Sequence, residues 1–319
     1  MNHIILFFRF IFSHIGKTIS VLVLTILFVF LLFPFSDLND YISNKVSELT
    51  QKQVFVQFED MQINPLAPSI TLDKVHLETK AIESLSIDSL ITKPSIIALI
   101  KKQAGGNIKA EGIFKGEIDL NLTPLANNEA GGQKLNLAVD AQKINLHELR
   151  KALKVNLPLT GIAQLASRLN IDSSFQEQPD GDFQATIDNF DLTSASLNLG
   201  MDVLNLPDVK MKKIVIKGKI SNGKIVIESA KLGLPTDDLF GQITGEIGLK
   251  ISMIGGKPLP EFGDIKMNID LTAKQAFKEK ASLFLSLLSQ CVKDDAGITL
   301  IKCKVMAGSQ GTPQISPLN

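Results

Sequence analysis

Apolar and polar residues alternate along much of the chain beyond residue 53, and this alternation is the strongest pattern in the sequence. Apolar residues occupy every second position in segments such as 54–58, 118–122, 135–139 and 265–271. A period of two places one set of side chains on each face of a β-strand. We therefore expect a mainly β fold, built as an elongated antiparallel sheet with one apolar face and one polar face.

One hairpin can be predicted in register. The dipeptide Asn222-Gly223 accepts positive φ at both central positions of a type I′ turn. A two-residue loop then pairs Ile220 with Ile225 on one face of the hairpin. The same register predicts a Lys217–Glu228 pair on the other face.

Helical signals are few, and they predict peripheral helices. Three short ones are expected over residues 38–49, 94–102 and 146–154. The longest is expected from Ala273 to Val292, with Thr272 and Gln275 as a capping box. Its apolar stripe would pack against one end of the sheet.

Loops are predicted where Gly, Asn, Pro and other polar residues gather, at residues 127–133, 173–182 and 255–263. The stretch 173–182 carries only a mild shift in composition. We therefore treat residues 36–319 as one β-rich domain.

The N-terminal part of the chain has the pattern of a membrane anchor. Residues 19–35 are almost wholly apolar and about long enough to span a bilayer. Arg9 and Lys17 precede them, so the positive-inside rule places residues 1–18 in the cytoplasm and residues 36–319 across the membrane. A cleaved signal peptide is the alternative, but the apolar run is long and no small-residue cleavage motif follows it.

Charge and aromatic content exclude nucleic acid as an expected partner. The chain has 33 basic and 33 acidic side chains, no Trp and one Tyr. A phosphate backbone requires a basic face, and single strands require aromatic stacking platforms.

No catalytic centre is expected. His76 and His147 have no nearby Cys or second His for a metal. The pairs Asp237-Asp238 and Asp294-Asp295 lie in turn-like stretches, so we expect solvated loop charges. Residues 218–224 approximate a phosphate-binding loop, but Ile225 replaces the required Ser or Thr. We expect a protein that is not an enzyme and that uses no cofactor, metal or nucleotide.

Two cysteines, Cys291 and Cys303, would both lie outside the cytoplasm, where disulfides persist. Their spacing fits no zinc pattern. The alternatives are two free buried thiols and a disulfide that ties a helix end to the next strand. We predict the disulfide.

The apolar strand face must be buried, and the sequence does not determine what covers it. The face can pack on itself, on helices, on another protein or on lipid chains.

The opening of the β region resembles that of AsmA-like proteins, in which an anchor helix leads into an extended β groove. The resemblance rests on Phe33-Pro34-Phe35 at the end of the anchor, followed by Val54–Phe58, Ile63-Asn64-Pro65 and Leu72–Leu77.

Later motifs look like the type II secretion protein GspN family, in its Leptospira/Bdellovibrio-type form. They are Leu157–Gly161, the run from Leu206 to Lys224, Gly297–Leu300 and Gly311-Thr312-Pro313. This resemblance covers nearly the whole chain and implies a single-pass inner-membrane accessory of the secretion apparatus, facing the periplasm. Its implied partners are the membrane and other secretion subunits. The AsmA-like groove implies the alternative function, lipid binding or transfer, with lipid acyl chains as partners.

Overall fold

The structure, a computed structural model of the 319-residue chain, describes most of the sequence. The described residues are 15–32, 38–64, 67–79, 82, 84–127, 132–193, 195–199, 202–254, 257–295, 297–308 and 314–318.

The described helices lie outside the sheet, and all except α2 and α3 are short. They are α2 (Ile15–Leu32), α3 (Asn39–Leu49), α4 (Ile96–Ile100), η2 (Ile113–Lys115), α5 (Leu146–Ala152), α6 (Gln275–Lys280), α7 (Ser282–Leu287) and η3 (Ser289–Cys291). The strands are β1 (Val54–Gln57), β2 (Asp60–Asn64), β3 (Ser69–Thr79), β4 (Leu85–Pro94), β5 (Gly106–Glu111), β6 (Glu117–Asn127), β7 (Gln133–Asn145), β8 (Leu159–Asp172), β9 (Asp180–Leu192), β10 (Ala195–Leu199), β11 (Asp202–Leu206), β12 (Val209–Ser221), β13 (Lys224–Leu232), β14 (Leu239–Ile254), β15 (Lys257–Lys274), β16 (Val292–Asp295), β17 (Ile298–Ala307) and β18 (Gln314–Pro317).

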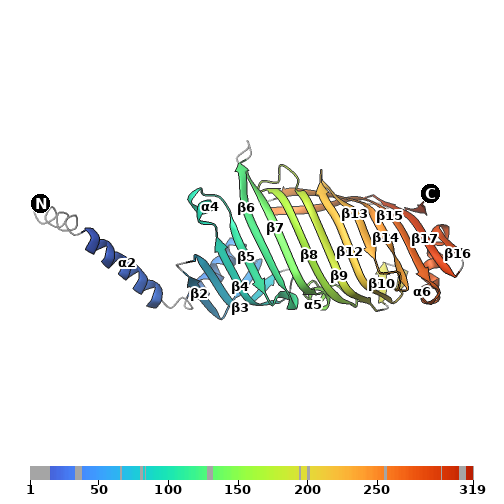
Figure 1. The fold of residues 1–319 in the computed structure, drawn as a ribbon, viewed down its shortest axis with the longest axis horizontal. Coiled ribbons are helices and arrows are strands. Elements are labelled where there is room, and N and C mark those ends of the chain that lie inside the picture. Colours follow the sequence, from blue (N-terminus) through green and yellow to red (C-terminus); the bar gives the residue numbers. More distant parts are fainter. Residues whose placement is uncertain are drawn as a thin grey trace, which may run out of the picture.

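The strands form one sixteen-stranded antiparallel sheet in which neighbours along the chain are mostly neighbours in space. The separate hairpin β10–β11 interrupts this order, so that β9 pairs with β12. Figure 1 shows the sheet as one elongated body, with the strands stacked side by side from β2 to β17. The predicted mainly β, elongated antiparallel architecture is confirmed.

Buried cores lie at the two ends of this sheet. At the N-terminal end, Phe58, Val75 and Ile87 are buried. Leu38, just before α3, and Ile42, within α3, pack against this cluster. At the C-terminal end, side chains of β12, β14, β15 and β17 pack against the short helices that follow β15. The burial that stabilises the fold is therefore concentrated where helices cover the sheet.

The long helix predicted over Ala273–Val292 is wrong. β15 continues to Lys274, because its backbone groups are paired with β17, and only short helical turns follow. Lys274 is the N-cap residue of α6 and no side chain caps it, so the predicted capping box is also wrong. The apolar stripe was predicted correctly, since Phe277, Ala281 and Leu285 are buried in the C-terminal core.

The other helix predictions are confirmed with shorter bounds, as α3, α4 and α5. α5 is capped by Asn145, whose side chain accepts hydrogen bonds from the backbone of His147 and Glu148.

Two loop predictions need correction. Residues 257–263 belong to β15, which contains Pro258 and Pro260 and here, among the described strands, pairs only with β14. Proline is tolerated at such an edge because its missing N–H faces no partner strand. The loop predicted over 173–182 ends earlier, because β9 begins at Asp180 and pairs with β8.

The predicted hairpin is confirmed at its tip and wrong further down. Asn222 and Gly223 have φ of 51° and 71°, and Ile220 pairs with Ile225. A bulge after Lys217 shifts the register, so Lys217 pairs with Ser229. Glu228 instead forms an ion pair with Lys219 at 3.2 Å.

The N-terminal helix α2 covers most of the apolar run, and its side chains at Val21, Leu22 and Phe28 are exposed. Within the described residues, no helix combines the length and the apolar character that crossing a membrane requires. Residues 1–14 and 33–37, on which parts of the predicted anchor and cytoplasmic segment fall, lie outside the described residues.

Candidate functional site: the apolar face of the sheet

A row of aliphatic side chains crosses one face of the sheet from strand to strand. Each member is the cross-strand partner of the next. The members of this apolar row are Leu122, Leu137, Leu169, Gly181, Ile220, Ile225, Ile247, Ile265 and Ala307, on β6–β9, β12–β15 and β17. Partners in a β-ladder share a face, so the row is one continuous apolar strip.

The apolar row is only partly covered. Its members are half-buried, whereas a parallel row nearer the C-terminal helices is buried at Ile214 and Ile301. Large apolar side chains are also exposed at Leu125, near the end of β6, and at Phe262, within β15, by 55% and 63%. A strip of this kind attracts apolar ligands or partners, because leaving it in water is unfavourable.

Glycines shape the same face. Gly181 has φ +152°, and a Cβ there would lie 2.0 Å from the carbonyl oxygen of Arg168. Gly245 has φ +157°, and its Cβ would lie 2.2 Å from the carbonyl oxygen of Lys266. Only glycine fits these positions, and at Gly181 it leaves a gap in the apolar row between Leu169 and Ile220.

The rim beside the apolar row is braced by a side-chain clamp. Leu249 N–H donates to the carbonyl oxygen of Gly223 at 2.8 Å, so β14 runs past the tip of the β12–β13 hairpin. Beyond that point, the Gln178 amide of the β8–β9 turn donates to and accepts from the backbone of Ile251. These bonds fix the outer end of β14–β15 along the rim (Figure 1).

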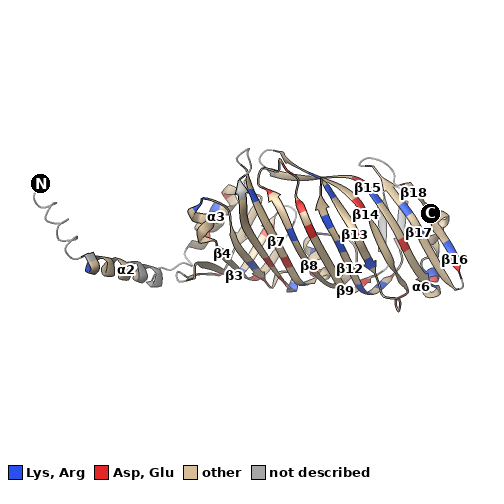
Figure 2. Ribbon diagram, turned by 45° about the horizontal axis from the view of Figure 1, so that its top comes forward, with Lys and Arg blue, Asp and Glu red and all other residues tan. Residues whose placement is uncertain are grey.

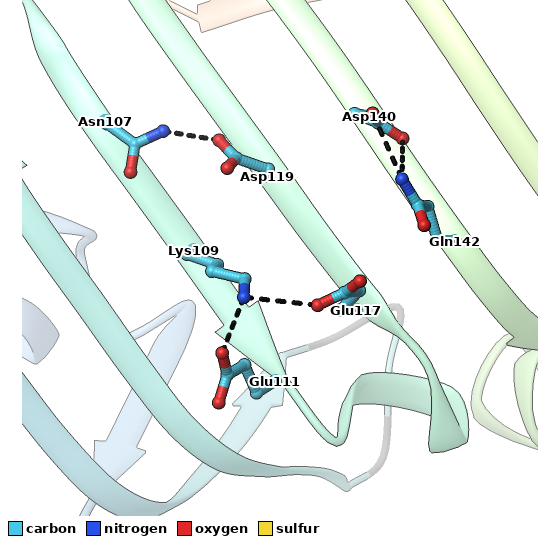
Figure 3. A network of polar contacts seen from close by, with 7 residues as sticks. All are labelled: Asn107, Lys109, Glu111, Glu117, Asp119, Asp140 and Gln142. Atoms are coloured by element: carbon cyan, nitrogen blue, oxygen red, sulfur yellow. Dashed lines mark hydrogen bonds and ion pairs between the residues drawn. The ribbon is translucent and has the colours of Figure 1, made fainter.

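The opposite face is polar, and side chains on this face compensate the like charges that lie next to each other on it. Glu111 lies opposite Glu117, and Asp119 lies opposite Asp140, which are unfavourable like-charge pairs. Figure 3 shows how the first pair is compensated, since Lys109 Nζ lies 2.7 Å from Glu111 and 3.2 Å from Glu117. These hydrogen bonds raise the pKa of Lys109.

The two aspartates are held by amides. Asn107 donates to Asp119, and Gln142 donates to Asp140 at 3.2 Å (Figure 3). Figure 2 shows that basic and acidic residues are interspersed along the strands. Exposed ion pairs of this kind contribute little to stability.

A hollow of about 590 Å³ lies on the polar face over β6–β9, β12 and β13. Its floor contains the small residues Ala138 and Ala166, and charges of both signs surround it. Among the described residues, no group of three or more His, Cys, Asp or Glu side chains could hold a metal ion.

The histidines singled out from the sequence occupy ordinary surroundings. His76 is exposed, and its Nδ1 lies 3.2 Å from Ser86 Oγ. His147 is half-buried, and its Nδ1 contacts the Arg150 guanidinium. His76 thus contacts a residue of the adjacent strand β4, and His147 contacts a residue of its own helix α5.

Asp237 contradicts the prediction of a solvated loop charge, because only 8% of the residue is exposed. Its carboxylate accepts hydrogen bonds from the backbone N–H groups of Leu234 and Lys212, both at 2.9 Å. Burial alone would raise its pKa, but these donors and nearby lysines hold the pKa below its usual value. It ties the β13–β14 turn to β12.

Asp172, which was not among the predicted site residues, does the same in the β8–β9 turn. It is 3% exposed and binds Ser174, Gln176 and Glu177. Burial opposes its charge, yet these hydrogen bonds lower its pKa. An Asp followed two residues later by Ser is a signal of such a turn.

The remaining aspartates of that prediction are surface residues. Asp238, Asp294 and Asp295 are exposed, although Asp294 and Asp295 belong to β16 rather than to a loop. Asp294 lies 2.7 Å from Lys278, whose ammonium group lowers its pKa.

Cys291 and Cys303 are free and buried, and both belong to the C-terminal core. Burial, together with the hydrogen bond and the charge interaction of this thiol with Cys291, raises the pKa of the Cys303 thiol to about 12. The structure therefore brings the two sulfurs together without a bond between them, and the disulfide stays a prediction.

Comparison with known proteins finds no matching family model, no matching curated protein and no matching solved structure.

Proposed function

We propose that this chain is a non-catalytic accessory component of the type II protein secretion system, anchored in the bacterial inner membrane and acting through a periplasmic sheet. The sequence resemblance to the GspN family supports the system. The observation that carries the proposal is the apolar row, because it gives the sheet a surface on which another molecule can bind.

The apolar sequence of residues 19–35 supports the anchor. The 18 residues of α2 span roughly 27 Å at about 1.5 Å per residue, short of the ~30 Å of a bilayer core, and the apolar sequence continues beyond them to Phe35. Alkaline extraction of membranes should leave the full chain in the membrane fraction. Release of intact chain into the supernatant would contradict the anchor.

The proposed role predicts binding partners among the secretion subunits. Leu169 belongs to the apolar row, whereas Arg168 beside it is exposed on the polar face. Affinity purification of the full chain from mild detergent should recover secretion subunits. Leu169→Gln should reduce that recovery, and Arg168→Gln should leave it unchanged. A folded wild-type chain that recovers no secretion subunit would contradict the proposal.

A second function, lipid-acyl binding or transfer, is favoured by the length of the apolar row. From β6 to β15 the row crosses seven strand spacings, or roughly 34 Å at about 4.8 Å each. That is about twice the ~15 Å depth of one leaflet's hydrocarbon. The row is therefore long enough to hold the whole length of an extended lipid acyl chain.

Lipid binding is tested separately from partner binding. Mass spectrometry of gently extracted full chain should detect bound phospholipid, and Leu169→Gln should lower its amount relative to Arg168→Gln. Protein that carries no lipid and binds no added fluorescent phospholipid would exclude this second function.

A further inference from the structure

Helix α4 shows the reverse of the burial pattern expected for a helix on a soluble domain. Its small residue, Ala98, is fully buried. Its four large residues are exposed: Ile96 by 52%, Ile97 by 68%, Leu99 by 60% and Ile100 by 77%. A helix on a water-facing surface normally buries its large apolar side chains and exposes polar ones.

This arrangement is built into the fold. A Cβ on Gly105 would lie 2.8 Å from the Cβ of Ala98, so the small residues let the helix sit directly on the following segment. Ser95 caps the helix through Ala98 N–H, and its own N–H donates to the Gly105 carbonyl oxygen at 3.0 Å. The Gln133 side chain binds both backbone groups of Ala104. The exposed side chains are therefore held outward by a well-anchored turn.

The sequence that flanks α4 carries charge of one sign. Between Asp88 and Glu111 the sequence contains Lys93, Lys101, Lys102 and Lys109 and no acidic residue. Lys109 is paired across the sheet, but Lys101 and Lys102 are exposed and form no ion pair with any described residue. A cluster of large aliphatic side chains followed by two free ammonium groups is complementary to an anionic lipid surface.

The position of α4 allows such contact. The helix projects at the upper edge of the sheet, beside the outer end of β6 (Figure 1). On β6, Leu125 is 55% exposed and extends the apolar area. A helix that projects from the edge of the sheet can touch the flat surface of a bilayer.

We propose that α4 is a membrane-contact element, which inserts Ile96, Ile97, Leu99 and Ile100 into the surface of a bilayer while Lys101 and Lys102 bind anionic phospholipid headgroups. The inference rests on the proposed anchor only because that helix keeps the sheet next to a bilayer. It gives the domain a second attachment, which fixes the orientation of the sheet at the membrane.

The experiment places an environment-sensitive fluorophore at position 99. Full chain carrying Leu99→Cys is reconstituted in nanodiscs of phosphatidylcholine, with or without phosphatidylglycerol. Native Cys291 and Cys303 are buried and should not label in the folded protein. Leu283→Cys is the matched control, because Leu283 is a 66% exposed leucine on the short helix α7 at the far end of the sheet.

The probe at position 99 should shift to the blue in discs that contain phosphatidylglycerol and should be quenched by lipid-attached quenchers. Lys101→Glu with Lys102→Glu should lower the ratio of inserted to water-exposed probe by at least roughly tenfold. The probe at position 283 should stay water-like throughout.

A water-like probe at position 99 in anionic discs would overturn the proposal. A blue shift that follows protein concentration rather than lipid would overturn it as well, by assigning α4 to contact with a second copy. Failure of the anchor is distinguishable, because such a chain would not enter the discs at all.

Discussion

Gln178 and Ile251, 73 positions apart in the chain, form a paired hydrogen bond between a side-chain amide and a strand backbone. Ile251 N–H donates to Gln178 Oε1 at 2.7 Å, and Gln178 Nε2 donates to the Ile251 carbonyl oxygen at 3.0 Å. The clamp links the β8–β9 turn to the outer end of β14, and so holds the rim beside the apolar row in place.

Gln178→Ala should loosen this rim without unfolding the sheet. Loss of both bonds should cost about 1–2 kcal/mol locally, which corresponds to roughly five- to thirtyfold faster hydrogen exchange at the Ile251 amide. Gln176→Ala is the control, because the Gln176 side chain is exposed on the same turn. Unchanged exchange at Ile251 would show that the clamp contributes nothing.

Gly223→Val tests the hairpin turn. Gly223 has φ +71°, and a Cβ there would lie 3.3 Å from the Leu249 carbonyl oxygen. A β-branched residue resists this conformation, so the substitution should lower the free energy of unfolding by about 1–2 kcal/mol. Asn222→Gly should be nearly neutral in the same thermal melt. A valine variant that melts with the wild type would contradict the type I′ turn.

Asp237→Ala tests the buried carboxylate. It removes the acceptor of two backbone N–H groups and should destabilise the protein by about 2–3 kcal/mol at neutral pH. Asp238→Ala, at the exposed neighbour, should have little effect. Equal effects of the two substitutions in chemical denaturation would contradict the structural role of Asp237.

The effect of Asp237 should depend on pH with a defined sign. Its pKa in the folded protein lies below the usual value of 3.8, so its stabilisation is present above about pH 4 and is lost as pH falls through the lowered pKa. The difference between wild type and Asp237→Ala should therefore shrink in acid. A difference that grew below pH 4 would mean that the pKa is raised instead.

The cysteine pair is tested by counting thiols in chain isolated from the cell envelope. Native protein should label slowly, because both thiols are buried and the pKa of Cys303 is raised to about 12. If the predicted disulfide forms in the oxidising compartment, denatured but unreduced chain should also fail to label. Labelling of both residues after denaturation alone would establish free thiols.

The sequence predicted the fold well where a local pattern decides it. Alternation of period two predicted the antiparallel strands, and Asn222-Gly223 predicted the turn with its first cross-strand pair. The same reasoning failed where tertiary pairing overrides local preference. Thr272 and Gln275 match a capping box, but pairing with β17 keeps Thr272 in β15.

The candidate site was predictable in kind and not in detail. Alternation predicted an apolar face, yet the apolar row depends on register across many strands, and bulges such as the one after Lys217 cannot be placed from one sequence. The buried role of Asp237 was missed for a similar reason, since one of its donors, Lys212, is 25 positions away.

The most direct test of the proposed function is mass spectrometry of the full chain extracted gently from native membranes, scored for both protein subunits and lipids. We predict that other type II secretion subunits accompany the chain and that Leu169→Gln, but not Arg168→Gln, diminishes them. Intact chain that carries stoichiometric phospholipid and no secretion subunit would contradict the accessory role and make lipid handling the function of the apolar row.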